Sequence, residues 1–227
     1  MNIEDRSILI TGASRGIGRA WSLALHAAGA NVIATCRNPS DAPELIEAGL
    51  RVEALDVTSD ASVAALVKTL AGAPIETLIN NAGIFGPKDQ TLATVDLQTF
   101  DAIYQTNVLG ALRVTRAFIP TLRGQDSPWV VNVSSRVGSI GGNENGTIAG
   151  YRMSKAAMNM FTRTLSIDEP NLSVVSIHPG WVQTDMGGAE ASLTIDESVT
   201  ALCGLLSQFN AASNGRFFNY TGEELPW

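Results

Sequence analysis

The stretch Ser7-Ile8-Leu9-Ile10-Thr11-Gly12-Ala13-Ser14-Arg15-Gly16-Ile17-Gly18 decides the fold of this chain. Residues 7–11 are mostly apolar and β-branched and predict a buried parallel strand. The glycines that follow open a helix, where glycine permits a tight turn and close approach of the backbone to a pyrophosphate. The helix N-terminus then faces the anion. We therefore expect a dinucleotide cofactor to contact Gly12, Ser14, Arg15, Gly16, Ile17 and Gly18.

The spacing of these glycines is G-x-x-x-G-x-G, which departs from the common G-x-G-x-x-G pattern. A glycine-rich turn that binds no ligand is therefore the competing interpretation.

The strand and helix patterns of this first unit repeat along the chain. Further strands are expected at Asn31 to Cys36, Arg51 to Leu55, Ile75 to Asn80, Trp129 to Ser134, Leu172 to His178 and Arg216 to Tyr220. Helices are expected at Gly16 to Ala28, Ser40 to Ala48, Ser59 to Ala71, Leu97 to Arg123, Tyr151 to Ile167 and Ile195 to Phe209. This alternation predicts an α/β fold, a doubly wound parallel sheet of about seven strands with helices on both faces (a Rossmann fold). We expect residues 1–227 to form a single domain that carries both the cofactor site and the substrate site.

Composition and charge narrow the classes of partner. Hydrophobic residues make up 45% of the 227-residue chain, which is typical of a globular protein. The formal net charge of −7 argues against a nucleic-acid or anionic-membrane surface, because both need clustered Lys and Arg. Cys36 and Cys203 form no C-x-x-C motif, so no metal site is expected. No apolar leader or membrane-spanning stretch is present, and we expect a cytoplasmic protein.

The end of the second strand reads Ala34-Thr35-Cys36-Arg37 and contains no acidic residue. An NAD site would place an Asp or Glu there to accept hydrogen bonds from the ribose 2′-hydroxyl. Arg37, with Arg15 nearby, is instead suited to a 2′-phosphate, which favours NADP(H) over NAD(H). The competing interpretation of Arg37 is a solvated residue that opens a loop.

Tyr151 and Lys155 lie four positions apart, where helical periodicity puts them on one face. A phenol with a pKa near 10 is a poor acid–base catalyst at neutral pH unless its phenolate is stabilised. An ammonium a few ångströms away lowers the pKa of the phenol. The pair therefore indicates proton transfer beside the dinucleotide, although such pairs also occur on solvated helix faces.

Together these motifs resemble the short-chain dehydrogenases/reductases over essentially the whole chain. The resemblance rests on Thr11 to Gly18, Asp56-Val57, Asn80-Asn81-Ala82-Gly83, Asn107 and the trio Ser135, Tyr151 and Lys155. It is strongest to C-factor-like and carbonyl-reductase-like members, through segments such as His178-Pro179-Gly180-Trp181-Val182 and the closing Leu225-Pro226-Trp227.

The resemblance implies roles for residues outside the glycine-rich turn. Asp56 and Val57 are implied to contact the adenine, and Asn81, Ala82 and Gly83 to line the ribose region. Pro179, Gly180, Val182 and Thr184 are implied to flank the nicotinamide. Asn107 is implied to hold a water that passes protons between Lys155 and solvent. In the competing interpretations Asp56 caps a helix, Asn81 stabilises the sheet, Thr184 starts a helix and Asn107 kinks one.

Three serines compete to polarise the substrate carbonyl. Ser135 is favoured, because the family motif places the catalytic hydroxyl second after the strand and Ser134 points the opposite way. Ser139 stays open, since the register of the intervening loop does not follow from spacing. The catalytic set expected is Ser135, Tyr151, Lys155 and Asn107.

The resemblance implies an NADPH-dependent carbonyl reductase. Its substrate would be a small apolar or aromatic ketone or aldehyde, or the matching alcohol, in a pocket shaped by loops Arg136 to Gly150 and Trp181 to Leu193, with Ile140, Trp181 and Met186 as apolar walls. The alternative is a cofactor-binding signalling or redox-sensing protein with little turnover. Homodimer, homotetramer and monomer all stay open.

Overall fold

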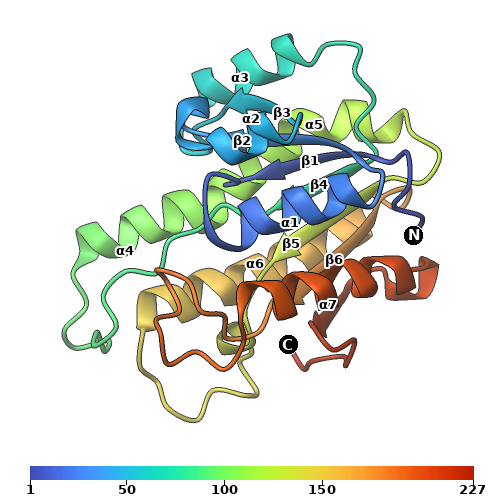
Figure 1. The fold of residues 1–227 in the computed structure, drawn as a ribbon. Helices are drawn as coiled ribbons and strands as arrows, with labels where there is room; N and C mark the ends of the chain where they lie inside the picture. The colour runs from blue at the N-terminus through green and yellow to red at the C-terminus, as the bar shows by residue number, and fades with distance from the viewer.

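The computed structural model describes all of residues 1–227 and is built on one parallel sheet (Figure 1). The sheet has the order β3-β2-β1-β4-β5-β6-β7, and every neighbouring pair runs parallel. Its strands are β1 (Ser7–Thr11), β2 (Asn31–Cys36), β3 (Arg51–Ala54), β4 (Thr77–Asn80), β5 (Trp129–Val133), β6 (Ser173–His178) and β7 (Arg216–Asn219). This confirms the expected doubly wound α/β fold. The strand order reverses between β1 and β4, which is where such sheets bind ligands.

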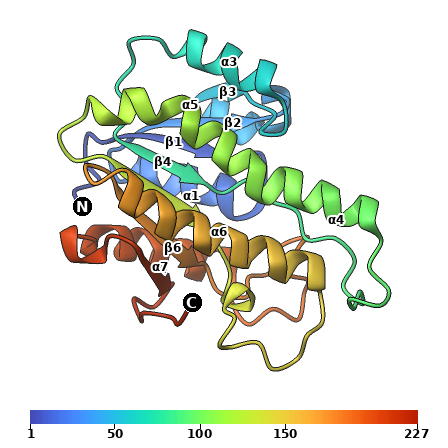
Figure 2. The same ribbon diagram turned by 180° about the vertical axis from the view of Figure 1, so that it is seen from behind.

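Helices cover both faces of the sheet. One face carries α1 (Gly16–Ala27), α2 (Pro43–Glu47) and α7 (Ile195–Gln208), and the other carries α3 (Asp60–Thr69), α5 (Ala111–Arg123) and α6 (Ala149–Asp168). Figures 1 and 2 show the two layers from opposite sides, with α1 and α7 in front in one and α5 and α6 in front in the other. Each layer buries its own apolar cluster against the sheet. None of the helices combines the length and the apolar character needed to cross a bilayer.

The long helix expected from Leu97 to Arg123 is interrupted. Helix α4 (Leu97–Tyr104) passes into a π-helical segment, Gln105–Gly110, before α5 begins. Asn107 lies in this wide segment, and Gly110 allows it to approach Val57, because a Cβ at Gly110 would lie 2.7 Å from Val57 Cγ2. Apolar periodicity does not distinguish a π segment from an α-helix, which is why one continuous helix was expected.

The remaining boundaries differ from expectation by a few residues. Several expected strands are shorter at one end, and Leu55, Ile75, Ser134, Leu172 and Tyr220 lie just outside them. Helix α6 begins two residues before Tyr151, at Ala149, after Ile148 in the left-handed region at φ 53°.

A buried polar network crosses the centre of the sheet. Asn80 Nδ2 donates to Asn132 Oδ1 at 2.8 Å, and Asn132 Nδ2 donates to Thr162 Oγ1 at 2.8 Å. The Thr162 and Ser176 hydroxyls are 2.7 Å apart, so the network joins β4, β5, β6 and α6. These bonds fix the strands that lead into the site relative to the helix that carries Tyr151 and Lys155.

Candidate active site

A cleft with a volume of about 920 Å³ opens beyond the carboxyl ends of the strands. It gathers most of the expected cofactor residues from segments far apart in the chain. Those lining it are Gly12, Ser14, Arg15, Gly16, Ile17, Gly18, Arg37, Asp56, Val57, Asn81, Ala82, Gly83, Tyr151, Lys155, Pro179 and Thr184. Gly180, Val182, Ser135 and Asn107 do not line it.

The glycine-rich turn packs too closely for side chains at two of its glycines. A Cβ at Gly18 would lie 2.3 Å from the Gly12 carbonyl oxygen and 2.4 Å from Asn81 Nδ2. Gly12 has φ +70°, and a Cβ there would lie 2.7 Å from Ala82 Cα. Gly16, at φ +56°, meets nothing closer than 3.6 Å and keeps the entrance to α1 open toward the cleft. A turn with free N–H groups and an uncapped helix N-terminus beside an open cleft fits a pyrophosphate.

Asn81 holds this turn against β4. Its Nδ2 donates to the Thr11 carbonyl at 2.9 Å and to the Gly12 carbonyl at 3.0 Å. The Thr11 hydroxyl in turn accepts the N–H groups of Asn81 and Ala82, both at 3.0 Å. These bonds place Ala82 and Gly83 at the cleft wall. Asn81 is thus a tether between the two strands that meet at the switch point.

The expected adenosine end of the cleft carries Arg37, Asp56 and Arg15. Arg37 is exposed, and its charge contributes to a lowered pKa at Asp56, although the two hydrogen bonds from Thr58 are the larger cause. Asp56 does not cap α3, since Ser59 does so by accepting the Ser62 N–H. Arg15 pairs with Asp185 at 2.8 Å, and both side chains are largely exposed. Arg37 is therefore the cation more available to a 2′-phosphate.

Tyr151 and Lys155 both line the cleft, where Lys155 is buried and Tyr151 is half-buried. Lys155 Nζ lies 5.5 Å from the centroid of the Tyr151 ring and donates to the Val133 carbonyl at 2.8 Å. The Phe85 ring packs on the Tyr151 ring, with ring centroids 4.6 Å apart.

The pKa of Tyr151 moves opposite to the expected direction. Burial raises it to about 12, and the Ser135 hydroxyl opposes that rise. Burial also lowers the pKa of Lys155 to about 8. Desolvation is the larger cause of the Tyr151 shift, and Lys155 directs one of its N–H groups to the Val133 carbonyl. The pair therefore favours the neutral phenol, the form able to donate a proton.

The structure separates the three candidate serines. Ser134 Oγ donates to Asn159 Oδ1 at 2.6 Å and is committed to α6. Ser139 Oγ donates to the Trp227 carbonyl at 3.1 Å and is committed to the C-terminal tail. Ser135 Oγ accepts the Val137 N–H at 3.4 Å and lies close enough to the Tyr151 hydroxyl to lower the pKa of that phenol. Of the three, Ser135 is the one in position to act together with Tyr151.

Asn107 is fully buried and bonded to protein groups. Its Nδ2 donates to the Ile84 carbonyl at 2.9 Å and to Ser154 Oγ at 3.0 Å, and its Oδ1 accepts the Ile84 N–H at 2.8 Å. Both amide hydrogens are therefore used. The side chain ties the loop after β4 to α6, which leaves little capacity for the expected water.

The segment after β6 approaches the cleft from the other side. Thr184 starts no helix: its hydroxyl accepts the Gly187 N–H at 3.1 Å within a turn. Val182 is buried, and Gly180, at φ +91°, leaves room for Leu193 and Tyr220. Both residues shape the segment from behind and do not face the cleft. Among the three expected apolar walls, Met186 lines the cleft, whereas Ile140 and Trp181 do not.

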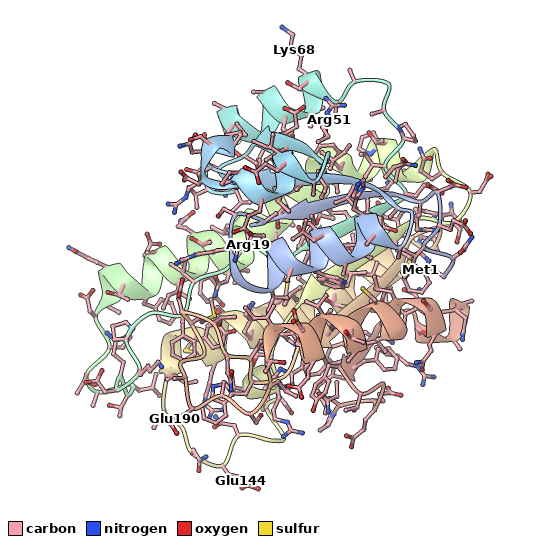
Figure 3. The ribbon with its side chains drawn as sticks, in the orientation of Figure 1. Met1, Arg19, Arg51, Lys68, Glu144 and Glu190 are labelled. Atoms are coloured by element: carbon pink, nitrogen blue, oxygen red, sulfur yellow. The ribbon has the colours of Figure 1, made fainter.

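The two long loops lie at the same end of the molecule. Figure 3 shows Glu144 and Glu190, one from each loop, projecting at one edge, and Figures 1 and 2 both show these loops around the start of α6.

Sequence reasoning missed Phe85, Asp185 and Trp227 at this site. Phe85 directly follows the Asn-Asn-Ala-Gly segment, which was a usable signal. Asp185 and Trp227 reach Arg15 and Ser139 across 170 and 88 positions, and no local pattern marks such pairs.

Comparisons with known proteins agree with this geometry. The family model described as short chain dehydrogenase matches residues 6–193. The chain is 44% identical over 156 residues to the C-signal protein of Myxococcus xanthus, which covers 68% of this chain and 93% of that protein. Among solved structures, it is similar to carbonyl reductase Sniffer of D. melanogaster, with a TM-score of 0.88, 33% identity and coverage of 98% and 99% of the two chains.

A short-chain dehydrogenase/reductase from Burkholderia multivorans, solved with bound NADP, is equally similar. It has a TM-score of 0.90 and 34% identity, with coverage of 98% of this chain and 100% of that chain. The sheet order, the glycine-rich turn and the Tyr151–Lys155 pair match this assignment. The chain belongs to the short-chain dehydrogenase/reductase family and is an oxidoreductase of that family.

Proposed function

We propose that this protein is an NADPH-dependent carbonyl reductase in which Tyr151 donates the proton. One observation carries the proposal: a half-buried phenol with a raised pKa lines a dinucleotide-sized cleft and has the Ser135 hydroxyl beside it. The cofactor supplies the hydride when bound. Tyr151 then protonates the carbonyl oxygen, and Ser135 donates a hydrogen bond to the charge that develops there. Lys155 lies beneath the phenol ring and favours the phenolate once the proton has left.

The substrate class follows from what surrounds the phenol. The Phe85 ring packs against Tyr151, and Ile84 and Met186 line the cleft. A small apolar or aromatic ketone or aldehyde matches these apolar neighbours. We also propose that residues 1–227 form one domain with both sites, because the cleft draws residues from position 12 to position 195.

Arg37 supports the preference for NADP(H). It lines the cleft and lies exposed at the end of β2, where no carboxylate is present for a ribose 2′-hydroxyl. A charge-assisted bond to a 2′-phosphate contributes about 1.5–3 kcal/mol, so Arg37→Ala should raise the Kd for NADPH at least about tenfold. Binding of NADH should not change. Arg51→Ala is the matched control, because Arg51 pairs with Glu53 on β3 and lies outside the cleft.

The second candidate function is a cofactor-binding signalling protein. It is favoured by the 44% identity to the C-signal protein of Myxococcus xanthus. A binding-only role places no demand on the Tyr151 phenol or on Ser135, so turnover distinguishes the two candidates.

The deciding experiment measures NADPH oxidation with a panel of aromatic and aliphatic ketones and aldehydes. Tyr151→Phe should lower kcat by at least about a hundredfold, because it removes the proton donor. Tyr104→Phe should match the wild type, since Tyr104 stacks on Phe100 away from the cleft. Equal rates for Tyr151→Phe and wild type would overturn the catalytic assignment. Tight NADPH binding without turnover of any carbonyl would favour the signalling role.

A further inference from the structure

The closing segment Leu225-Pro226-Trp227 has no part in the proposed chemistry, yet it contacts the loop that carries Ser135. The Trp227 carbonyl oxygen accepts three hydrogen bonds from that loop: from the Ser139 hydroxyl at 3.1 Å, the Ile140 N–H at 2.9 Å and the Gly141 N–H at 3.3 Å. Ser139 is buried, whereas the Ile140 side chain is 79% exposed. The loop is therefore held here through its polar groups, with no apolar contribution from Ile140.

The tail is itself anchored to the edge of the sheet. The Trp227 ring stacks on Phe217 of β7, with ring centroids 5.8 Å apart and planes 17° apart. The Leu225 N–H donates to the Phe217 carbonyl at 2.7 Å, and Glu224 pairs with Phe218 across an antiparallel bridge. Phe217 is buried in the sheet. Trp227 thus links a rigid strand to the loop after β5.

The held segment continues directly into Ser135. The 3₁₀ turn Arg136–Gly138 connects them: the Gly138 N–H donates to the Ser135 carbonyl at 2.8 Å, and the Ser139 N–H donates to the Arg136 carbonyl at 3.0 Å. This turn packs on α6 at the Lys155 position, because a Cβ at Gly138 would lie 2.6 Å from the Lys155 carbonyl carbon. Its inner side is fixed by α6, and its outer end is fixed by Trp227.

A second clamp holds other points of the same loop. Arg152 donates to the Thr147 carbonyl at 2.8 Å through Nε and to the Val137 carbonyl at 3.2 Å through a terminal nitrogen. Arg152 makes no described hydrogen bond to Ser139, Ile140 or Gly141. Apart from turn bonds within the loop itself, the hydrogen bonds of these three residues go to Trp227.

We propose that Trp227 is a positioning residue that acts through Ser139 and the 3₁₀ turn to orient the Ser135 hydroxyl toward Tyr151. The proposal rests on the catalytic role proposed for Ser135. A loop that is free at its outer end lets the turn rotate, and the bond from Ser135 to the developing oxyanion weakens. That bond strengthens in the transition state, so its loss lowers kcat more than it raises KM.

The test uses three variants of the 227-residue protein, one shortened and two with a single substitution. A chain that ends at Pro226 lacks both the acceptor and the ring, Ser139→Ala lacks one donor, and Trp227→Phe keeps an aromatic ring and the carbonyl. Amide hydrogen exchange is measured at Gly138, Ile140 and Gly141, together with kcat, KM and the Kd for NADPH.

The chain ending at Pro226 should exchange the Ile140 and Gly141 amides about fivefold faster or more, as expected for the loss of hydrogen bonds worth about 1 kcal/mol each. The Gly138 amide should follow. The kcat should fall by a similar factor, with KM and the Kd for NADPH nearly unchanged. Ser139→Ala should show a smaller effect in the same direction, and Trp227→Phe should restore wild-type behaviour.

Two results would overturn the proposal. Unchanged exchange at Ile140 and Gly141 would mean that the tail does not hold the loop. Faster exchange there, with Gly138 unaffected or kcat unchanged, would mean that the tail holds the loop without orienting Ser135. A wild type that reduces no carbonyl would instead refute the proposed function, and the exchange at Gly138 would still report on the positioning.

Discussion

Replacing Asn107 with alanine distinguishes a structural side chain from a water-holding one. Asn107 is fully buried and makes three hydrogen bonds, two to the main chain of Ile84 and one to the Ser154 hydroxyl. Each contributes about 1 kcal/mol net, and the Ile84 groups left without partners add a further cost. The higher helix propensity of alanine returns about 0.5 kcal/mol. We expect Asn107→Ala to lower the free energy of unfolding by about 3–4 kcal/mol.

The assay is thermal and urea unfolding followed by circular dichroism. For a chain of 227 residues, the expected loss corresponds to a fall in Tm of about 10 °C. Gln105→Ala is the matched control within the same π-helical segment, because its one described side-chain bond is a long, exposed contact with Asp101. That control should stay within about 0.5 kcal/mol of wild type.

A Tm for Asn107→Ala within about 2 °C of wild type would refute this reasoning. If such a stable variant also lost most of its activity, the water-relay role implied by the family resemblance would be favoured. If stability and activity fell together, with the remaining folded fraction active, the tether between Ile84 and Ser154 would be the role of the side chain.

Three further predictions follow from the geometry. Gly18→Ala should destabilise the fold by about 1–3 kcal/mol and weaken NADPH binding, because its Cβ would lie 2.3 Å from the Gly12 carbonyl oxygen. The control Gly204→Ala in α7 meets no atom within 4 Å and should be stabilising. Calorimetry measures the stability of each variant, and fluorescence titration measures its NADPH binding. Burial lowers the pKa of His178 from 6.5 to about 4, so the unfolded state takes up a proton first as the pH falls. The free energy of unfolding should therefore drop between those two pH values, by about 2 kcal/mol near pH 5. A His178→Gln variant with the same pH slope in urea unfolding would contradict this. Asp185→Asn should free Arg15 and lower the Kd for NADPH about twofold to fivefold. The Tm should stay nearly unchanged, because the Arg15–Asp185 pair is exposed. Tighter binding of NADH as well would argue against a contact with the 2′-phosphate.

Much of the fold was predictable because its signals are local. The β-branched runs and the apolar helical spacing located all seven strands and the main helices, with errors at the ends. The expected strand ends at Ser134 and Tyr220 each lie one residue beyond the last paired residue, which is Val133 in β5 and Asn219 in β7. The π-helical segment at Gln105–Gly110 was missed, since its widened turn depends on neighbours outside the helix.

The candidate site was predictable where its residues belong to a short sequence motif. The glycine-rich turn, Asn81 and the Tyr151–Lys155 pair all lie at the cleft. The pKa of Tyr151 was not predictable from spacing. Four positions in a helix bring the ammonium near the ring, but the surrounding protein decides that desolvation dominates.

The sequence by itself determined the order of strands and helices, the glycines of the turn and the helical spacing of Tyr151 and Lys155. The periodicities of helices and strands repeat every few residues, so a short stretch of sequence is enough to show them. Only the tertiary structure decided that Ser139 binds Trp227, that Arg15 meets Asp185 and that Asn107 is committed to Ile84. Those contacts depend on how whole elements pack against one another, and a partner 88 or 170 positions away leaves no periodic signal in the chain.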